Sequence, residues 1–156
     1  MSSSLPKTPT PELGNLLNAG ALRSTDFEVP QAIQFRRNAV TLMADARASH
    51  MSPQGRYILA YEGIHALAVG LIYLYSLAPA GELGHRIRVL QLACKLLQSS
   101  TDDFQEISHA SAVRNEKLYR SPAPPVGNQE SLDLLNIGLK SIDAAGRLFP
   151  EWFALK

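Results

Sequence analysis

The sequence predicts an all-α protein, an up-and-down bundle of four long helices plus a short N-terminal helix. Apolar residues recur at steps of three and four through most of the chain, and capping residues, prolines and glycines divide these stretches at short intervals. Strands are not expected, because no run of four to eight residues alternates apolar and polar side chains between turn signals. The short connections favour the up-and-down arrangement.

A single domain is expected over residues 11–156, preceded by a disordered N-terminal tail at residues 1–10. A chain of 156 residues is long enough to bury roughly 68 to 70 per cent of its unfolded surface around one core, so no second domain is needed. The tail is rich in Ser, Pro and Thr, with Lys7 as its only charged side chain. It lacks the apolar stretch of a secretory signal.

Capping residues and prolines mark where the first helices begin. Thr10-Pro11 predicts a short helix that ends near Asn18-Ala19-Gly20, and Ser52-Pro53 predicts the start of a long one. Between them, a helix from about Pro30 to Ser49 has two rows of apolar residues, which together form one broad buried face.

The helix that begins with the second of these caps is expected at the centre of the bundle. From Tyr57 to Leu77 it is apolar almost all round, and its only residues of the Asp, Glu, Lys, Arg and His types are Glu62 and His65. Gly63 and Gly70 lie on one face of it. Because glycine has no side chain, we expect a neighbouring helix to approach closely there.

Two shorter helices are expected next. One runs from about His85 to Gln98 with Cys94 among its inward residues, and the other begins in the capping run Ser99–Asp103. This second helix should end near Tyr119 or Arg120. The loop that follows contains three prolines, and it cannot be helical.

The last helix is predicted to be capped by Asn128. Its apolar residues keep the three-four spacing until Pro150 ends it. Trp152 and Phe153 then follow as a terminal apolar clasp.

The overall charge and the single cysteine exclude several classes of protein. Fifteen Lys and Arg residues against fourteen Asp and Glu leave a net charge of +1, so any anion site must be local. The uncharged run Ala66–Ala80 is shorter than the roughly twenty residues that span a bilayer, and no membrane contact is expected. Cys94 has no partner for an internal disulfide and suits a packing residue in a reducing, cytoplasmic location.

No metal or cofactor site is predicted. The histidines His50, His65, His85 and His109 are scattered over different elements, without paired cysteines or a His-Glu-x-x-His pattern. Phosphate-loop, nucleophile-elbow and dinucleotide motifs are absent from the sequence as well. His65, three residues after Glu62, is expected to be a hydrogen-bonded core histidine rather than a catalyst.

One arginine lies on the apolar face of its predicted helix. Arg114 continues a stripe at steps of three and four that comprises Phe104, Ile107, Ser111 and Leu118. An unpaired buried charge is strongly destabilising. Arg114 must therefore meet a carboxylate, or line a wet cleft that can hold an anion.

Neighbouring cations extend this feature along the helix. Arg114, Lys117 and Arg120 follow one another at three-residue spacing and form a basic row. The alternative is that salt bridges neutralise this row. The acids available for such bridges are Glu116, Glu130 and Asp133.

A second possible anion site lies at the start of another helix. His85 and Arg86 follow Gly84, and free backbone N–H groups at a helix start favour an anion. The alternative interpretation is a solvated first turn.

The order of these features is similar to that of the HEPN family of small helical bundles, found in prokaryotic toxin-antitoxin and antiviral systems and in some eukaryotic proteins. The resemblance covers most of the chain. It rests on Asn15-Leu16-Leu17-Asn18, Ser52-Pro53-Gln54-Gly55-Arg56-Tyr57 with Ala60-Tyr61, Gly84-His85, and Arg114-Asn115 with Tyr119. It implies a homodimer in which two motif helices face each other across one cleft, and a nucleotidyltransferase or an antitoxin as partner.

The chain departs from the ribonucleases of that family at one position. Those members carry an arginine followed after a short spacing by a histidine, and the two act in metal-independent cleavage of RNA. Arg114 matches the arginine and Asn115 a common next residue, but Tyr119 stands where the histidine is expected. A phenol with a pKa of roughly 10 is poorly suited to move protons at neutral pH, so we expect cleavage to be weak or lost.

Three interpretations follow, and none of them requires a metal or a cofactor. The first is a dimeric HEPN-like module, cytoplasmic and prokaryotic, that binds a nucleotide, RNA or a partner segment. Its binding residues would be Arg114, Asn115, Lys117, Tyr119, Arg120, His85 and Arg86. The second is an active ribonuclease toxin with Arg114 and Tyr119, alone or together with His85, as catalytic residues. The third is a structural adaptor in which a carboxylate of the same bundle neutralises Arg114.

Overall fold

The computed structural model describes residues 5–81, 86–114 and 126–156, and these residues are mainly helical. The helices are α1 (Pro11–Asn18), α2 (Val29–Ala46), α3 (Pro53–Tyr73), α4 (Arg86–Leu96), α5 (Thr101–Ala112), α7 (Asn128–Leu148) and α8 (Pro150–Phe153). Two short strands, β1 (Leu22–Ser24) and β2 (Leu77–Pro79), complete the elements. The prediction of a mainly helical protein is confirmed.

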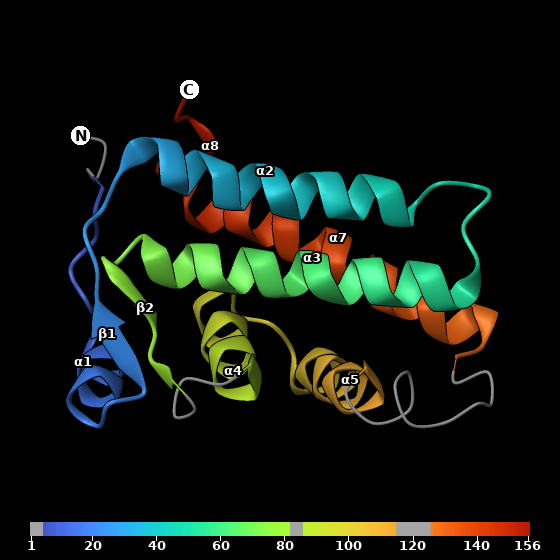
Figure 1. Ribbon diagram of the computed structural model, residues 1–156, viewed down its shortest axis with the longest axis horizontal. Helices are drawn as coiled ribbons and strands as arrows, with labels where there is room; N and C mark the ends of the chain where they lie inside the picture. Colours follow the sequence, from blue (N-terminus) through green and yellow to red (C-terminus); the bar gives the residue numbers. More distant parts are fainter. Residues whose placement is uncertain (1–4, 82–85, 115–125) are drawn as a thin grey trace.

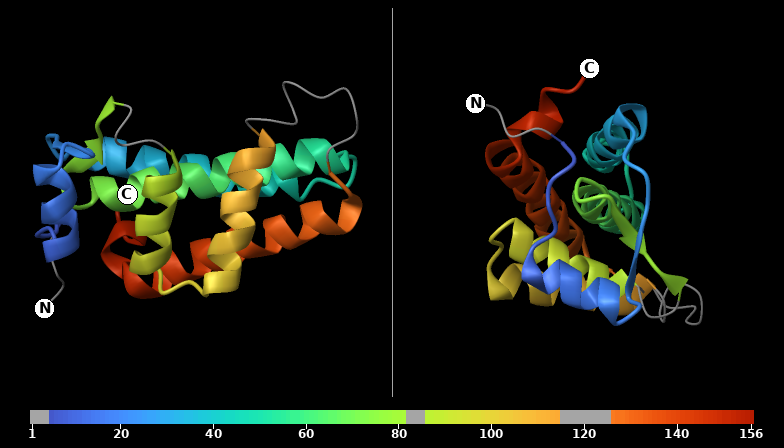
Figure 2. Two further views of the ribbon diagram at one scale, coloured as in Figure 1. Left: turned by 90° about the horizontal axis from the view of Figure 1, so that it is seen from below. Right: turned by 90° about the vertical axis from the view of Figure 1, so that its left-hand side faces the viewer.

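Three long helices and two shorter ones form two layers (Figure 1). The helices α2, α3 and α7 lie side by side along the long axis of the molecule, and α3 packs against both of the others. The helices α4 and α5 run across this axis and cover one side of α3 (Figures 1 and 2). Because two helices cross the others, the up-and-down arrangement predicted from the short connections is not confirmed.

A small antiparallel sheet corrects the prediction that strands are absent. β1 pairs with β2, with Leu22 opposite Pro79. The helix expected to continue to Leu77 instead ends at Tyr73. Ser76 then adopts a φ of 59°, a left-handed conformation that does not continue a helix. Strands of three residues are too short to produce a recognisable alternation of side chains.

Three of the predicted N-terminal caps are confirmed. The hydroxyl groups of Thr10, Ser52 and Ser100 each accept a hydrogen bond from a backbone N–H three residues later. The predicted cap at Asn128 is wrong, because Gly127 occupies the capping position and Asn128 is the first residue of α7. The Asn128 side chain instead accepts a hydrogen bond from Arg56 at 3.1 Å.

The close approach predicted at two glycines of α3 is confirmed. A Cβ atom on Gly63 would lie 2.7 Å from the Cε atom of Met43, and one on Gly70 would lie 2.8 Å from the Cβ atom of Phe35. Both neighbours belong to α2. The two glycines therefore set how closely α2 packs on α3.

The terminal clasp is also confirmed. Trp152 of α8 is fully buried, and its Nε1 atom donates a hydrogen bond to the backbone oxygen of Ala32 at 2.8 Å. The Arg36 Nη1 atom donates to the backbone oxygen of Trp152 at 2.6 Å. These contacts hold the C-terminal turn against α2.

Part of the predicted N-terminal tail contacts the helices. The Lys7 backbone N–H donates to the oxygen of Leu74 at 2.7 Å, and its ammonium group lies 2.9 Å from the carboxylate of Glu151. Residues 1–4 of the predicted tail lie outside the described residues. Within the described ranges, no helix combines the length and apolar character needed to cross a bilayer.

Candidate functional site

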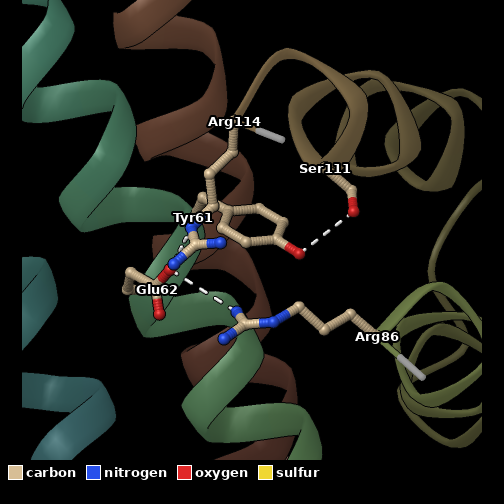
Figure 3. Close-up of polar contacts among 5 residues, drawn as sticks. All are labelled: Tyr61, Glu62, Arg86, Ser111 and Arg114. Atoms are coloured by element: carbon tan, nitrogen blue, oxygen red, sulfur yellow. Dashed lines mark hydrogen bonds and ion pairs between the residues drawn. The ribbon is translucent and has the colours of Figure 1, made fainter. Parts of the chain in front are cut away.

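Two arginines from different parts of the chain meet one carboxylate of the central helix (Figure 3). The Arg114 Nε atom lies 2.5 Å from Oε1 of Glu62, and the Arg86 Nη1 atom lies 3.5 Å from the same oxygen. We refer to Arg86 and Arg114 as the arginine pair. Glu62 therefore joins α3 to the start of α4 and to the residues that follow α5.

The crossing of α4 and α5 over α3 explains this meeting. The two helices run in opposite directions, so that the start of α4 and the end of α5 lie at the same edge of the molecule (Figure 2). Arg86 is the first residue of α4. Arg114 lies in a wider, π-helical turn immediately after α5, a geometry that is frequent at functional sites.

The guanidinium group of Arg114 packs over the ring of Tyr61. Its ring is fully buried, and the Arg114 Cζ atom lies 5.9 Å from the ring centroid, within the range of a cation–π contact. The Tyr61 hydroxyl donates a hydrogen bond to Oγ of Ser111 at 3.2 Å. Because Ser111 lies one turn before Arg114, this bond fixes the end of α5 on α3 and positions the guanidinium (Figure 3).

His65 lies one turn further along α3 and stays neutral at pH 7. Its ring stacks on that of Tyr61, with 6.5 Å between the centroids. The pKa of His65 is lowered to about 4, chiefly by burial; the positive charges of Arg86 and Arg114 also lower it, and Glu62 opposes them. Burial disfavours the charged form of a histidine, and nearby positive charge acts in the same direction.

The cluster is only partly buried. The exposed fraction of the side chain is 37% for Arg86, 27% for Glu62 and 22% for Arg114. The three side chains carry two positive charges and one negative charge, so their sum is positive. A guanidinium presents a planar set of N–H donors that matches the oxygens of a phosphate.

The structure answers the question that the sequence raises about Arg114. The inward arginine does meet a carboxylate, Glu62 of α3, which is not among the acids proposed from the sequence. Of those, Glu130 lies 3.4 Å from the Nε2 atom of His109, and Asp133 accepts a hydrogen bond from Gln129 at 2.8 Å. Glu116 lies outside the described residues.

Of the predicted binding residues, the structure brings Arg86 and Arg114 together. The sequence predicts them in two separate anion sites, whereas in the structure both contact Glu62. The remaining candidates lie outside the described residues and stay predictions. They are His85, Asn115, Lys117, Tyr119 and Arg120.

Sequence reasoning missed Glu62 as a site residue, although a signal was present. Glu62 is the only acidic residue between Tyr57 and Leu77, a stretch that is otherwise apolar almost throughout. A carboxylate kept on a central helix needs a cationic partner. Arg114, which itself needs a carboxylate, is such a partner.

Cys94 behaves as the packing residue expected from the sequence. Its side chain is buried in α4. Burial, as the largest effect, raises the pKa of the thiol to about 11. The thiolate form is therefore scarce at neutral pH, and Cys94 is unsuited to nucleophilic chemistry.

No known protein family, curated protein or solved structure matches this chain.

Proposed function

We propose that the arginine pair binds a phosphate group, and that the protein is a HEPN-like module for a nucleotide or RNA ligand. The observation that carries the proposal is the convergence of Arg86 and Arg114 on the single carboxylate of Glu62. Both guanidinium groups reach one oxygen of Glu62, so their N–H donors converge on one point. A phosphate group offers several oxygens that such converging donors can bind.

The accessibility of Arg86 supports this proposal. Its side chain is more exposed than those of Glu62 and Arg114, and its 3.5 Å contact with Glu62 is long for a charge-assisted hydrogen bond. A phosphate approaching from solvent would meet Arg86 first. Arg114, whose side chain is less exposed, would then add a second positive charge beside the bound phosphate.

The arginine pair also acts on His65. Burial is the main reason that the pKa of His65 is lowered, and both arginines lower it as well, against the opposing effect of Glu62. The positive charge of the arginines also attracts an anion.

Efficient RNA cleavage is not part of the proposal. The sequence places Tyr119 where the ribonucleases of the resembling family have a histidine. General acid–base catalysis at neutral pH requires a group that titrates near that pH. We therefore propose binding with weak or absent turnover.

The homodimer, the cytoplasmic and prokaryotic setting and the nucleotidyltransferase or antitoxin partner belong to the same proposal. They rest on the resemblance to the HEPN family, and the up-and-down bundle rests on the short connections. Analytical ultracentrifugation of the full chain tests the dimer. A monomer at micromolar concentration would remove the shared cleft from the proposal.

The contact between Glu62 and Arg114 also favours a second candidate, a structural adaptor without a ligand. In that case the ion pair serves to hold α5 on α3. The two candidates differ in what Arg86 does. An adaptor needs only the closer Glu62–Arg114 contact, whereas a phosphate site needs both members of the arginine pair.

Binding of a fluorescent single-stranded RNA oligonucleotide, measured by anisotropy, tests the proposal. Arg86→Ala should weaken binding by about tenfold or more, because one charged hydrogen-bond donor to phosphate is removed. Arg88→Ala is the matched control, since Arg88 lies on the same helix and is exposed. Equal binding by both variants would contradict the proposal. Absence of binding by the unaltered protein would favour the adaptor.

A further inference from the structure

Glu62 occupies the place that an anion would take between the two arginines. Its Oε1 atom receives contacts from both Arg114 and Arg86 (Figure 3). The carboxylate belongs to α3, whereas the arginines come from the start of α4 and from the turn after α5. A carboxylate of the protein itself therefore lies where the negatively charged group of a ligand would bind.

We infer that Glu62 is the specificity-determining residue of the site: it acts as an internal competitor that weakens anion binding and sets how strongly the site responds to ligand charge. The inference rests on the proposed phosphate site. It goes beyond the proposed function in one respect: removing the charge of Glu62 should raise the affinity for an anion rather than lower it.

Glu62 has two opposing effects on anion binding, and their relative sizes decide whether it raises or lowers the affinity. Glu62 orients the arginines, which favours binding by reducing their side-chain freedom. It also repels an incoming anion over a short distance. A glutamine at this position keeps an oxygen that accepts hydrogen bonds and removes only the charge. Orientation is therefore largely retained while repulsion is lost.

The repulsion depends on the charge of the ligand, and this gives a quantitative prediction. The free energy of interaction with Glu62 is proportional to the ligand charge. Removing the charge of Glu62 should raise the affinity by some factor for a ligand with one negative charge. For a ligand with two negative charges, the expected factor is the square of that number. A purely structural Glu62 would give no such relation.

Two adenosine nucleotides provide matched probes. Adenosine 3′,5′-cyclic monophosphate carries one negative charge, and adenosine 5′-monophosphate carries nearly two at about pH 8, because the second pKa of a phosphate monoester is about 6. Both contain the same base and sugar. Dissociation constants are measured by isothermal titration calorimetry on the full chain.

Glu62→Gln is expected to raise the affinity for the cyclic nucleotide about tenfold and for the monoester about a hundredfold, at low ionic strength. Glu62→Asp retains the charge and serves as control, with an expected change below about threefold. If Glu62→Gln fails to fold, Glu62→Ser removes the charge and leaves a shorter polar group. Arg86→Ala added to either variant should abolish the gain.

The outcomes separate this inference from the proposed function. If the unaltered protein binds the nucleotides and the charge-removing variant binds them equally or more weakly, the competitor role is wrong and the phosphate site stands. If only the charge-removing variant binds, Glu62 is a competitor, and the native site does not serve these nucleotides. If no variant binds either nucleotide, the inference is overturned together with the phosphate site.

Discussion

Glu62 and Arg114 meet at 2.5 Å between Oε1 and Nε, across helices that are not adjacent in the sequence. The contact joins the one acidic residue of α3 to an arginine in the turn that follows α5. Arg86 approaches the same oxygen. Glu62 and Arg114 thus provide each other with a partner of opposite charge. Arg86 lies beside them as a second cation.

The first prediction concerns the stability that the Glu62–Arg114 contact provides. Arg114→Ala should lower the free energy of unfolding by about 1 to 3 kcal/mol, between the values for exposed and buried ion pairs. The loss arises because Glu62 keeps a partly buried charge with one cation fewer. Urea denaturation followed by circular dichroism measures it.

The control for this experiment is Arg88→Ala, at an exposed position of α4. Its free energy of unfolding should stay within about 0.5 kcal/mol of the unaltered protein. Equal effects of the two substitutions would show that the ion pair contributes nothing specific to stability.

The second prediction concerns the packing of α2 on α3. Gly70→Ala should destabilise the protein by about 1 to 3 kcal/mol through overpacking, because the new Cβ atom would lie 2.8 Å from Phe35 Cβ and from Trp152 Cζ2. The gain in helix propensity, about 1 kcal/mol, offsets only part of this. Thermal and urea unfolding report the net change.

Gly14→Ala provides the opposite case within the same chain. Gly14 is helical, and a Cβ atom there would meet nothing within 4 Å. The substitution should stabilise the protein by about 0.5 to 1 kcal/mol. If Gly70→Ala stabilised the protein as well, the close approach of α2 and α3 would be wrong.

The third prediction concerns the reactivity of Cys94. With a thiol pKa of about 11 instead of the ordinary 9.0, the native protein should react slowly with iodoacetamide at neutral pH and rapidly once unfolded in urea. The raised pKa also makes the folded state less stable as pH rises from about 9 towards 11, because the unfolded chain loses its proton first. Rapid labelling of the native protein would contradict the burial of Cys94.

Cys94→Ala is the control for the effect of pH. It removes the titrating thiol, so the part of the alkaline destabilisation that Cys94 causes should disappear. Labelling of this variant should be absent in both the native and the unfolded state. An unchanged loss of stability would assign the alkaline effect to other groups.

The fourth prediction concerns His65. Its pKa is about 4 in the folded protein and 6.5 in its ordinary state, so the unfolded chain binds a proton first on acidification. His65 therefore contributes stability above about pH 6.5 that is lost as pH falls through about 4. His65→Gln should lose less stability between those pH values. An identical pH dependence in both proteins would contradict this assignment.

The sequence predicts local structure well where a single residue determines it. Thr10, Ser52 and Ser100 cap helices because their hydroxyl groups reach nearby N–H groups, and such contacts depend only on neighbours in the chain. Gly63 and Gly70 indicate a close helix neighbour for a similarly direct reason. Asn128 shows the limit, because Gly127 occupies the capping position although asparagine is the stronger capping residue.

The arrangement of helices and the partner of Arg114 depend on long-range packing. Short connections are compatible with both up-and-down and crossing helices, so the orientation of α4 and α5 could not be read from loop length. Several acids lie nearer to Arg114 in the sequence than Glu62 does, and sequence distance alone does not identify the partner. Glu62 became the partner because crossing helices bring distant segments to the same edge of α3.

The salt dependence of RNA binding tests the central claim most directly, because each cation that contacts a phosphate releases counterions. For single-stranded RNA, the slope of log K against log salt concentration should become less steep by about 0.7 in Arg86→Ala, and it should be unchanged in Arg88→Ala. That result would place phosphate at the arginine pair. An identical slope in both variants, or no measurable binding to the unaltered protein, would contradict it.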